Sequence, residues 1–203
     1  MPLQFIFRVK MSGVVNRGTG AGGGKTNANG IPFEKRTENE SRLLKKGFIR
    51  KDIPGKKNKN GFYLVKELSP TESITYVTKS GLKAYCKHFF KKEMCREPDE
   101  AYLIKKGDDY ILKVLEKKNQ NTPGSVDTKL LAGGGFIDEY EFLLGENFKV
   151  EYAFCLSAFL QKDYTGKSKK SEALRHVLKK QGIPVLFGED TDYFEKLDNW
   201  LSL

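Results

Sequence analysis

Residues 98–120 read PDEAYLIKKGDDYILKVLEKKNQ, and this stretch decides the fold that we expect for the chain. Two apolar runs flank the tetrapeptide KGDD, and a turn of this composition between apolar segments is typical of a β-hairpin. If the turn is centred on Gly107 and Asp108, Asp99 lies directly opposite Glu116 on the partner strand. A slip of one residue in either strand would turn these side chains to different faces of the ribbon, so the register is a sharp prediction.

This register collects three charged side chains at one end of the hairpin. Directly opposed residues have Cβ atoms roughly 4.5–5.5 Å apart, close enough for Asp99 and Glu116 to bracket one divalent cation. Lys118 shares the face of Glu116 because side chains along a strand alternate with a period of two. Hard cations such as Mg²⁺ take oxygen ligands and activate water for attack on a phosphate. We therefore expect Asp99, Glu116 and Lys118 to be catalytic, with Asp99 and Glu116 binding Mg²⁺, for which Mn²⁺ can substitute.

The residues around the hairpin resemble the PD-(D/E)XK motif of restriction-endonuclease-like enzymes. Pro98 and Asp99 are followed, after 16 intervening residues, by Glu116, Lys117 and Lys118. Several patches are similar to small type II restriction enzymes, including those of large DNA viruses of algae: GAGG at 20–23, then Thr26-Asn27 with Gly30 and Phe33-Glu34, REPDEAY at 96–102, LEKKNQ at 115–120 and GSVDTKL at 124–130. An aspartate followed at some distance by Glu-x-Lys is a weak pattern by itself. The Pro98-Asp99 pair, the hairpin spacing and these patches make the resemblance more specific.

The resemblance implies a fold, an activity and one further metal ligand. Strands mixed with helices already predict a mixed α/β fold with a central mixed β-sheet flanked by helices. The resemblance implies a restriction-endonuclease-like core of the order α-β-β-β-α-β. It further implies a type II site-specific endonuclease that hydrolyses double-stranded DNA as a homodimer. In this superfamily an acid on the first helix often joins the metal site, and Glu34 is the matching position.

The chain as a whole, residues 1–203, reads as a single domain with a glycine-rich loop at 16–30. Periodicity and turn residues predict the other elements. We expect strands at 62–68, 74–79, 151–160 and 183–187, a basic turn at 51–61, and helices at 32–47, 82–93, 125–144 (interrupted by the glycines 133–135), 171–181 and 192–201.

Composition predicts the compartment and the kind of partner. Lysine and arginine number 36 against 26 acidic residues, a net charge of +10 that favours a polyanion such as DNA. Cys86, Cys95 and Cys155 are odd in number and widely spaced, which is typical of free thiols in a reducing, cytoplasmic setting. No apolar run approaches the ~20 residues of a membrane span, so we expect no membrane contact.

Two groups of residues are candidate DNA contacts. Arg17, Lys25, Lys56 and Lys57 are expected to meet phosphates, although lysines in solvated turns would look the same. Asn119, Gln120 and Asn121 follow the active lysine, where amide side chains can pair with base edges. Gln120 is alternatively a support for the metal site.

Two other functions stay open at the level of sequence. A repair or structure-selective nuclease could use the same core, because fold does not determine function. A non-catalytic basic nucleic-acid-binding module would leave Asp99, Glu116 and Lys118 as the solvated end of a strand pair.

Overall fold

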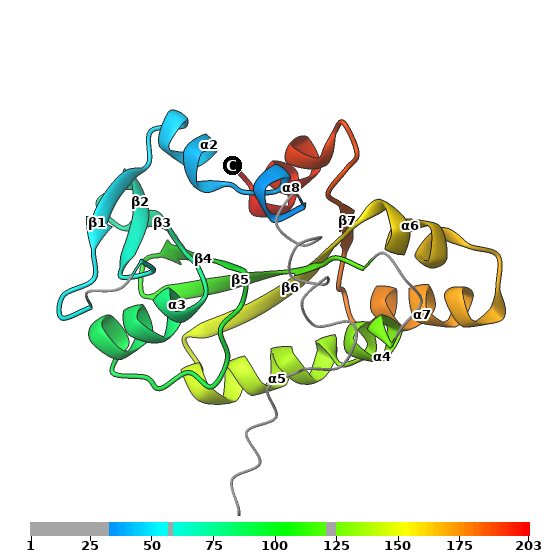
Figure 1. Cartoon of the computed structure of the whole chain (residues 1–203). Coiled ribbons are helices and arrows are strands. Elements are labelled where there is room, and N and C mark those ends of the chain that lie inside the picture. Colours follow the sequence, from blue (N-terminus) through cyan, green and yellow to red (C-terminus); the bar gives the residue numbers. More distant parts are fainter. Residues whose placement is uncertain (1–32, 57–58, 121–124) are drawn as a thin grey trace, which may run out of the picture.

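The computed structural model describes residues 33–56, 59–120 and 125–203. Within them, seven strands form one mixed sheet whose spatial order is the chain order (Figure 1). The strands are β1 (Ile49–Asp52), β2 (Phe62–Ser69), β3 (Glu72–Val77), β4 (Glu100–Lys106), β5 (Asp109–Lys118), β6 (Phe148–Leu156) and β7 (Val185–Phe187). Neighbours from β1 to β5 are antiparallel, whereas β6 runs parallel to both β5 and β7. The expected central mixed sheet is confirmed.

Helices flank the sheet on both sides. They are α2 (Glu40–Lys45), α3 (Ser80–Tyr85), a π-helical turn η1 (Cys86–Phe90), α4 (Val126–Leu131), α5 (Gly133–Leu144), α6 (Ala158–Thr165), α7 (Lys169–Lys180) and α8 (Tyr193–Leu201). In Figure 1, α3 and α5 lie below the sheet, and α2 and α8 lie above it. None of the helices in the described part of the chain combines the length and apolar character needed to cross a membrane.

Alternation along β5 separates two hydrophobic cores. Leu112 and Val114 belong to a buried cluster that includes Tyr140 of α5. Leu115 belongs to a second buried cluster that includes Leu197 of α8. Because successive side chains of a strand point to opposite faces, the end of β5 presents alternate residues to the α5 side and to the α2 and α8 side.

The segment expected as one helix at 32–47 is divided. Residues 33–36 are helical and α2 begins only at Glu40. Between them, Thr37 and Asn39 are fully buried. The Thr37 hydroxyl donates to the Phe33 carbonyl at 2.9 Å, and the Asn39 amide donates to the Tyr102 hydroxyl at 2.6 Å. The Asn39 bond anchors the segment between the two helices to Tyr102 of β4. Because this contact is tertiary, the local sequence does not predict where the helix is interrupted.

Three other expectations were wrong in detail. The basic turn at 51–61 begins within β1, an edge strand whose four residues are all exposed and therefore show no apolar alternation. The strand expected at 151–160 ends at Leu156 and gives way to α6. α5 begins at Gly133, so the glycines lie in its first turn and the break between the two helices falls at Ala132; a Cβ at Gly133 would lie only 2.7 Å from Ile183 Cδ1.

The two cysteines at 86 and 155 are buried, Cys95 is exposed, and all three are free thiols as expected. The expected glycine-rich loop at 16–30 and the residues Arg17, Lys25, Lys57 and Asn121 lie outside the described residues.

Candidate active site

The hairpin of β4 and β5 has the register that the sequence predicts. Glu100 pairs with Leu115, and the pairing continues without a shift to Lys106 and Asp109 at the turn. One further step along the same register places Asp99, the residue before β4, opposite Glu116. The Asp99 carboxylate accepts a hydrogen bond of 2.8 Å from the main-chain N–H of Lys117. This bond fixes the acid against the opposite strand.

Glu116 and Lys118 form an ion pair on the α5 side of β5. Lys118 Nζ lies 2.6 Å from Glu116 Oε1, and the two side chains are 21% and 23% exposed. Both are therefore largely withdrawn from solvent yet still accessible to a substrate. The structure thus brings Asp99, Glu116 and Lys118 together at the end of the hairpin.

The electrostatics of Glu116 favour a cation beside it. Burial, and after it the negative charge of Asp99, raises the pKa of Glu116 above its ordinary value. Lys118 and a hydrogen bond from the main chain of Asp99 act in the opposite direction without cancelling the rise. A buried carboxylate with a second carboxylate beside it is a site where added positive charge is stabilising.

A cavity of about 300 Å³ lies next to this ion pair. Besides Glu116 and Lys118 it is lined by Arg96, Lys129, Tyr140 and Tyr152, with Cys95, Glu97, Pro98 and Phe136 completing the wall. Burial, and after it the charge of Glu116, raises the pKa of both Tyr140 and Tyr152, so each keeps its hydroxyl proton. Three cations and two neutral hydroxyls beside the carboxylates suit a phosphodiester.

Arg96 and Lys129 were not among the candidate residues from sequence. Arg96 is held in place by Glu139 at 2.7 Å and lies over the Phe136 ring at 4.5 Å. Both residues fall within sequence patches that resemble restriction enzymes, but in a chain with 36 basic residues neither stands out. Only the tertiary structure, which places both in the wall of the cavity beside Glu116, singles them out.

Asp99 does not line that cavity; it lines a second one, of about 280 Å³, together with Glu34, Glu38, Lys59 and Lys79. Glu34 lies 3.6 Å from Lys79, and its side chain is 57% exposed. Glu116 does not line this cavity, so the structure places Glu34 near Asp99 but not at the Glu116 end of the site. Within the described ranges, no group of three or more His, Cys, Asp and Glu side chains is arranged to hold a metal.

The available donor set nevertheless fits Mg²⁺. This ion is commonly bound by one or two carboxylates, with water and substrate phosphate completing its shell. Asp99 and Glu116 supply such a pair, and the repulsion that raises the Glu116 pKa would be relieved by the ion. The role of Glu34 as a third ligand stays a prediction.

A buried polar network supports the site from the opposite face. Lys117 points to the α2 and α8 side, where its ammonium contacts Glu100 at 2.7 Å and the Thr37 carbonyl at 2.8 Å. The Lys117 and Glu100 side chains are only 8% and 2% exposed. Glu100 also accepts a 2.5 Å hydrogen bond from the Tyr102 hydroxyl, to which Asn39 donates in turn. Lys117 is therefore structural, although it lies between two candidate catalytic residues.

The described candidate DNA contacts lie at two places. Asn119 and Gln120 follow directly on Lys118, and the Ser157 hydroxyl lies 3.5 Å from the Gln120 nitrogen. Lys56 lies in the turn after β1 and does not line either cavity beside Asp99 or Glu116, whereas Lys59 of the same segment does. The structure brings Gln120 close to the site and leaves Lys56 apart from it.

No family model, curated protein or solved structure matches this chain.

Proposed function

We propose that this protein is a Mg²⁺-dependent endonuclease that hydrolyses phosphodiester bonds in double-stranded DNA, in the manner of type II restriction enzymes. The observation that carries the proposal is the hairpin register, which sets Asp99 opposite Glu116 and pairs Glu116 with Lys118 at 2.6 Å. The net charge of +10 favours a polyanionic substrate.

The order of elements around the hairpin agrees with the core that the sequence resemblance implies. The antiparallel strands β3, β4 and β5 are followed by the helices α4 and α5 and then by β6, which is parallel to β5. This corresponds to the β-β-β-α-β part of a restriction-endonuclease-like core, with the acids at the end of the central hairpin.

Each of the three residues has a distinct task in the proposed reaction. When bound by Asp99 and Glu116, Mg²⁺ would polarise the scissile phosphate and lower the pKa of the attacking water. Lys118 places a positive charge beside Glu116, where it can orient the water and offset charge on the phosphorane. Tyr140 and Tyr152, neutral and buried, can position non-bridging oxygens. Arg96 and Lys129 supply the cations that hold the DNA strand.

Digestion of plasmid DNA with purified protein tests the proposal. With Mg²⁺ we expect discrete fragments, Mn²⁺ should substitute, and an excess of EDTA should abolish cutting. Cleavage that survives EDTA would show that the carboxylate pair is not the site. Smearing or selective cutting of flaps would favour a structure-selective nuclease, and binding without cutting would favour a non-catalytic module.

A further inference from the structure

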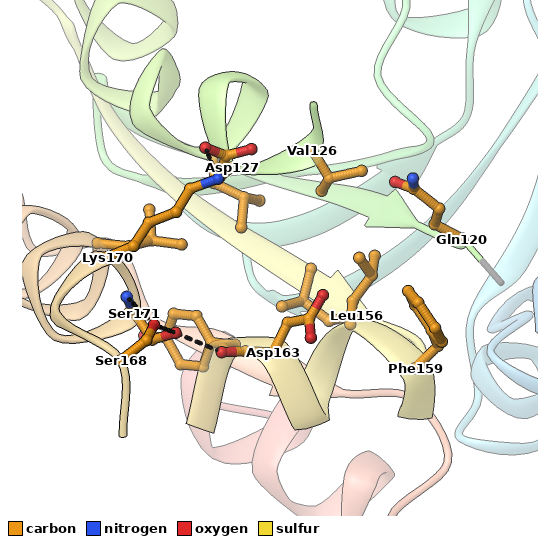
Figure 2. A pocket seen from close by; sticks show the side chains of 13 residues that line it. Gln120, Val126, Asp127, Leu156, Phe159, Asp163, Ser168, Lys170 and Ser171 are labelled. Carbon is orange, nitrogen blue, oxygen red and sulfur yellow. Dashed lines mark hydrogen bonds and ion pairs between the residues drawn. The ribbon is translucent and has the colours of Figure 1, made fainter. Parts of the chain in front are cut away.

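A third cavity, called the hollow below, lies just beyond the end of β5, the strand that carries Glu116 and Lys118. Gln120 is two residues beyond Lys118, a distance of about 6.6 Å along an extended chain. The pairing with β6 continues this far, because the Ser157 N–H donates to the Lys118 carbonyl at 3.1 Å and the Ser157 hydroxyl lies 3.4 Å from the Gln120 carbonyl oxygen. Gln120 lines the hollow (Figure 2), so the hollow adjoins the site at which a phosphate would be cut.

The hollow has an apolar floor and a polar rim. Its volume is about 240 Å³. Since one water molecule takes roughly 30 Å³ of the liquid, it has room for a planar ring system. Leu156, Leu160 and Leu174 are buried beneath it, and the aromatic rings of Phe159 and Tyr164 lie at its side. Gln120, Asp127, Asp163, Ser168, Lys170 and Ser171 form the rim.

The charges at the rim disfavour a phosphate. Lys170 lies 2.8 Å from Asp127, and with Asp163 the rim carries two carboxylates against one ammonium group, a net negative charge. Among the described residues, no lysine, arginine or histidine forms an ion pair with the Asp163 carboxylate. At the N-terminus of α7, the Ser168 hydroxyl accepts the Ser171 N–H at 3.1 Å, so one of the free N–H groups there is already satisfied. A neutral ring that donates hydrogen bonds suits this rim better than an anion does.

We propose that the hollow receives one nucleobase of the DNA, turned out of the duplex beside the scissile phosphate. The base would lie against Phe159 and Tyr164, while Asp163 and Gln120 contact its edge. Turning a base out of the stack is how proteins bring it into a pocket that the duplex cannot enter. Because a carboxylate only accepts hydrogen bonds, the hollow should prefer adenine, cytosine or guanine, whose exocyclic amino group can donate, over thymine, whose one donor, N3–H, lies between two carbonyl oxygens that a carboxylate repels. This inference rests on the proposed function.

The experiment uses duplexes that contain the cleavage site found by plasmid digestion. 2-Aminopurine replaces each base around the cut in turn, and Ca²⁺ replaces Mg²⁺ so that the complex forms without cutting. We expect one position next to the scissile phosphate to change its fluorescence strongly when the wild-type protein binds. Asp163→Asn should reduce the preference for amino-bearing bases at that position at least tenfold. Phe159→Ala should abolish the fluorescence change.

The matched control is Glu172→Gln, an exposed acid on α7 that does not line the hollow. It should leave both readouts unchanged. If the wild-type protein cuts DNA but every 2-aminopurine stays stacked and Asp163→Asn keeps its base preference, the nucleobase assignment is overturned. If no metal supports cutting, a pool of random-sequence duplexes carrying 2-aminopurine replaces the mapped site. A fluorescence change that depends on Phe159 then shows that the hollow binds a base and overturns only the proposed nuclease function, whereas no change in that pool overturns the nucleobase assignment as well.

Discussion

At the scale of single residues, the proposed chemistry depends on two carboxylates and one ammonium group, which would have opposite effects on DNA. Asp99 and Glu116 repel a phosphate unless a metal ion is present, whereas Lys118 attracts it under all conditions. Binding and cutting should therefore respond differently to the loss of each side chain, although the three groups lie together at the end of the hairpin.

Replacing Asp99 or Glu116 by the neutral amide should preserve or tighten DNA binding without metal while removing most cleavage. Loss of a metal ligand removes several kcal/mol of transition-state stabilisation, and each ~1.4 kcal/mol is tenfold in rate. Lys118→Ala should weaken binding modestly and cleavage severely. Gel-shift titration and single-turnover cleavage separate the two effects. A wild-type cleavage rate in Glu116→Gln would contradict the assignment, as would parallel loss of binding and cutting in all three variants.

Glu116 should also reduce the stability of the metal-free fold. Its pKa is raised in the folded protein from 4.5, mainly by burial and then by Asp99. A raised pKa means that the stabilising contribution of the group is complete below its ordinary pKa and is lost as the pH rises through the raised value. Ionised Glu116 therefore costs stability at pH 8. Glu116→Gln should raise the free energy of unfolding at pH 8, with the difference vanishing near pH 3.

Urea unfolding in EDTA at the two pH values measures this effect. Glu151→Gln is a useful comparison, because hydrogen bonds and charges from Lys149 and Lys113 outweigh burial and lower the pKa of Glu151. Its replacement should destabilise the fold at pH 8. If the two substitutions change the free energy of unfolding at pH 8 equally, ionised Glu116 does not destabilise the fold.

At the scale of elements, β5 serves two purposes on its two faces. Glu116 and Lys118 face the candidate site, and Lys117 between them anchors the strand through Glu100 to the buried layer below α2 and α8. A one-residue slip of β5 would exchange these roles and bury the wrong charges. The buried ion pair therefore opposes any other register.

Lys117→Met should destabilise the fold by about 3–5 kcal/mol, because it leaves the Glu100 charge buried without its partner. The double variant Lys117→Met with Glu100→Gln should recover much of that loss. Chemical denaturation gives both values. Lys149→Met is the control, since the Lys149 side chain is 68% exposed and its ion pair with Glu151 should contribute less than about 1 kcal/mol. If Lys117→Met lowers the free energy of unfolding no more than Lys149→Met does, the ion pair between Lys117 and Glu100 does not stabilise the register of β5 on β4.

At the scale of the whole molecule, one protomer provides one set of Asp99, Glu116 and Lys118. One set can attack one strand at a time, so concerted cutting of both strands of a duplex calls for two protomers. Twofold symmetry of a homodimer would match the twofold symmetry of a short palindromic site.

A homodimer predicts two protomers per bound duplex in sedimentation and double-strand breaks without accumulation of nicked DNA. Mixing wild-type protein with an excess of the Glu116→Gln variant should then convert double-strand cutting into nicking, because mixed dimers retain one active site. A one-to-one complex that only nicks would contradict the palindrome model.

The sequence alone determined the hairpin and its register. Asp99, Glu116 and Lys118 could be placed on one face because the period of a strand is two and because the turn at Gly107 and Asp108 leaves one natural pairing. The strands at 62–68 and 74–79 could be predicted for the same reason, since apolar residues and turn residues mark them locally.

Only the tertiary structure decided what surrounds that hairpin. The exposed strand β1 lacks an apolar pattern, and the break between residues 36 and 40 depends on Thr37 and Asn39 being buried against the sheet. The hollow joins Gln120, just beyond β5, to side chains of β6 and three helices, and Glu34 pairs with Lys79 instead of reaching Glu116. Such contacts join residues distant in the chain. The local sequence pattern predicts which face of a strand or helix a side chain lies on. The packing of whole elements determines which residues it contacts on that face.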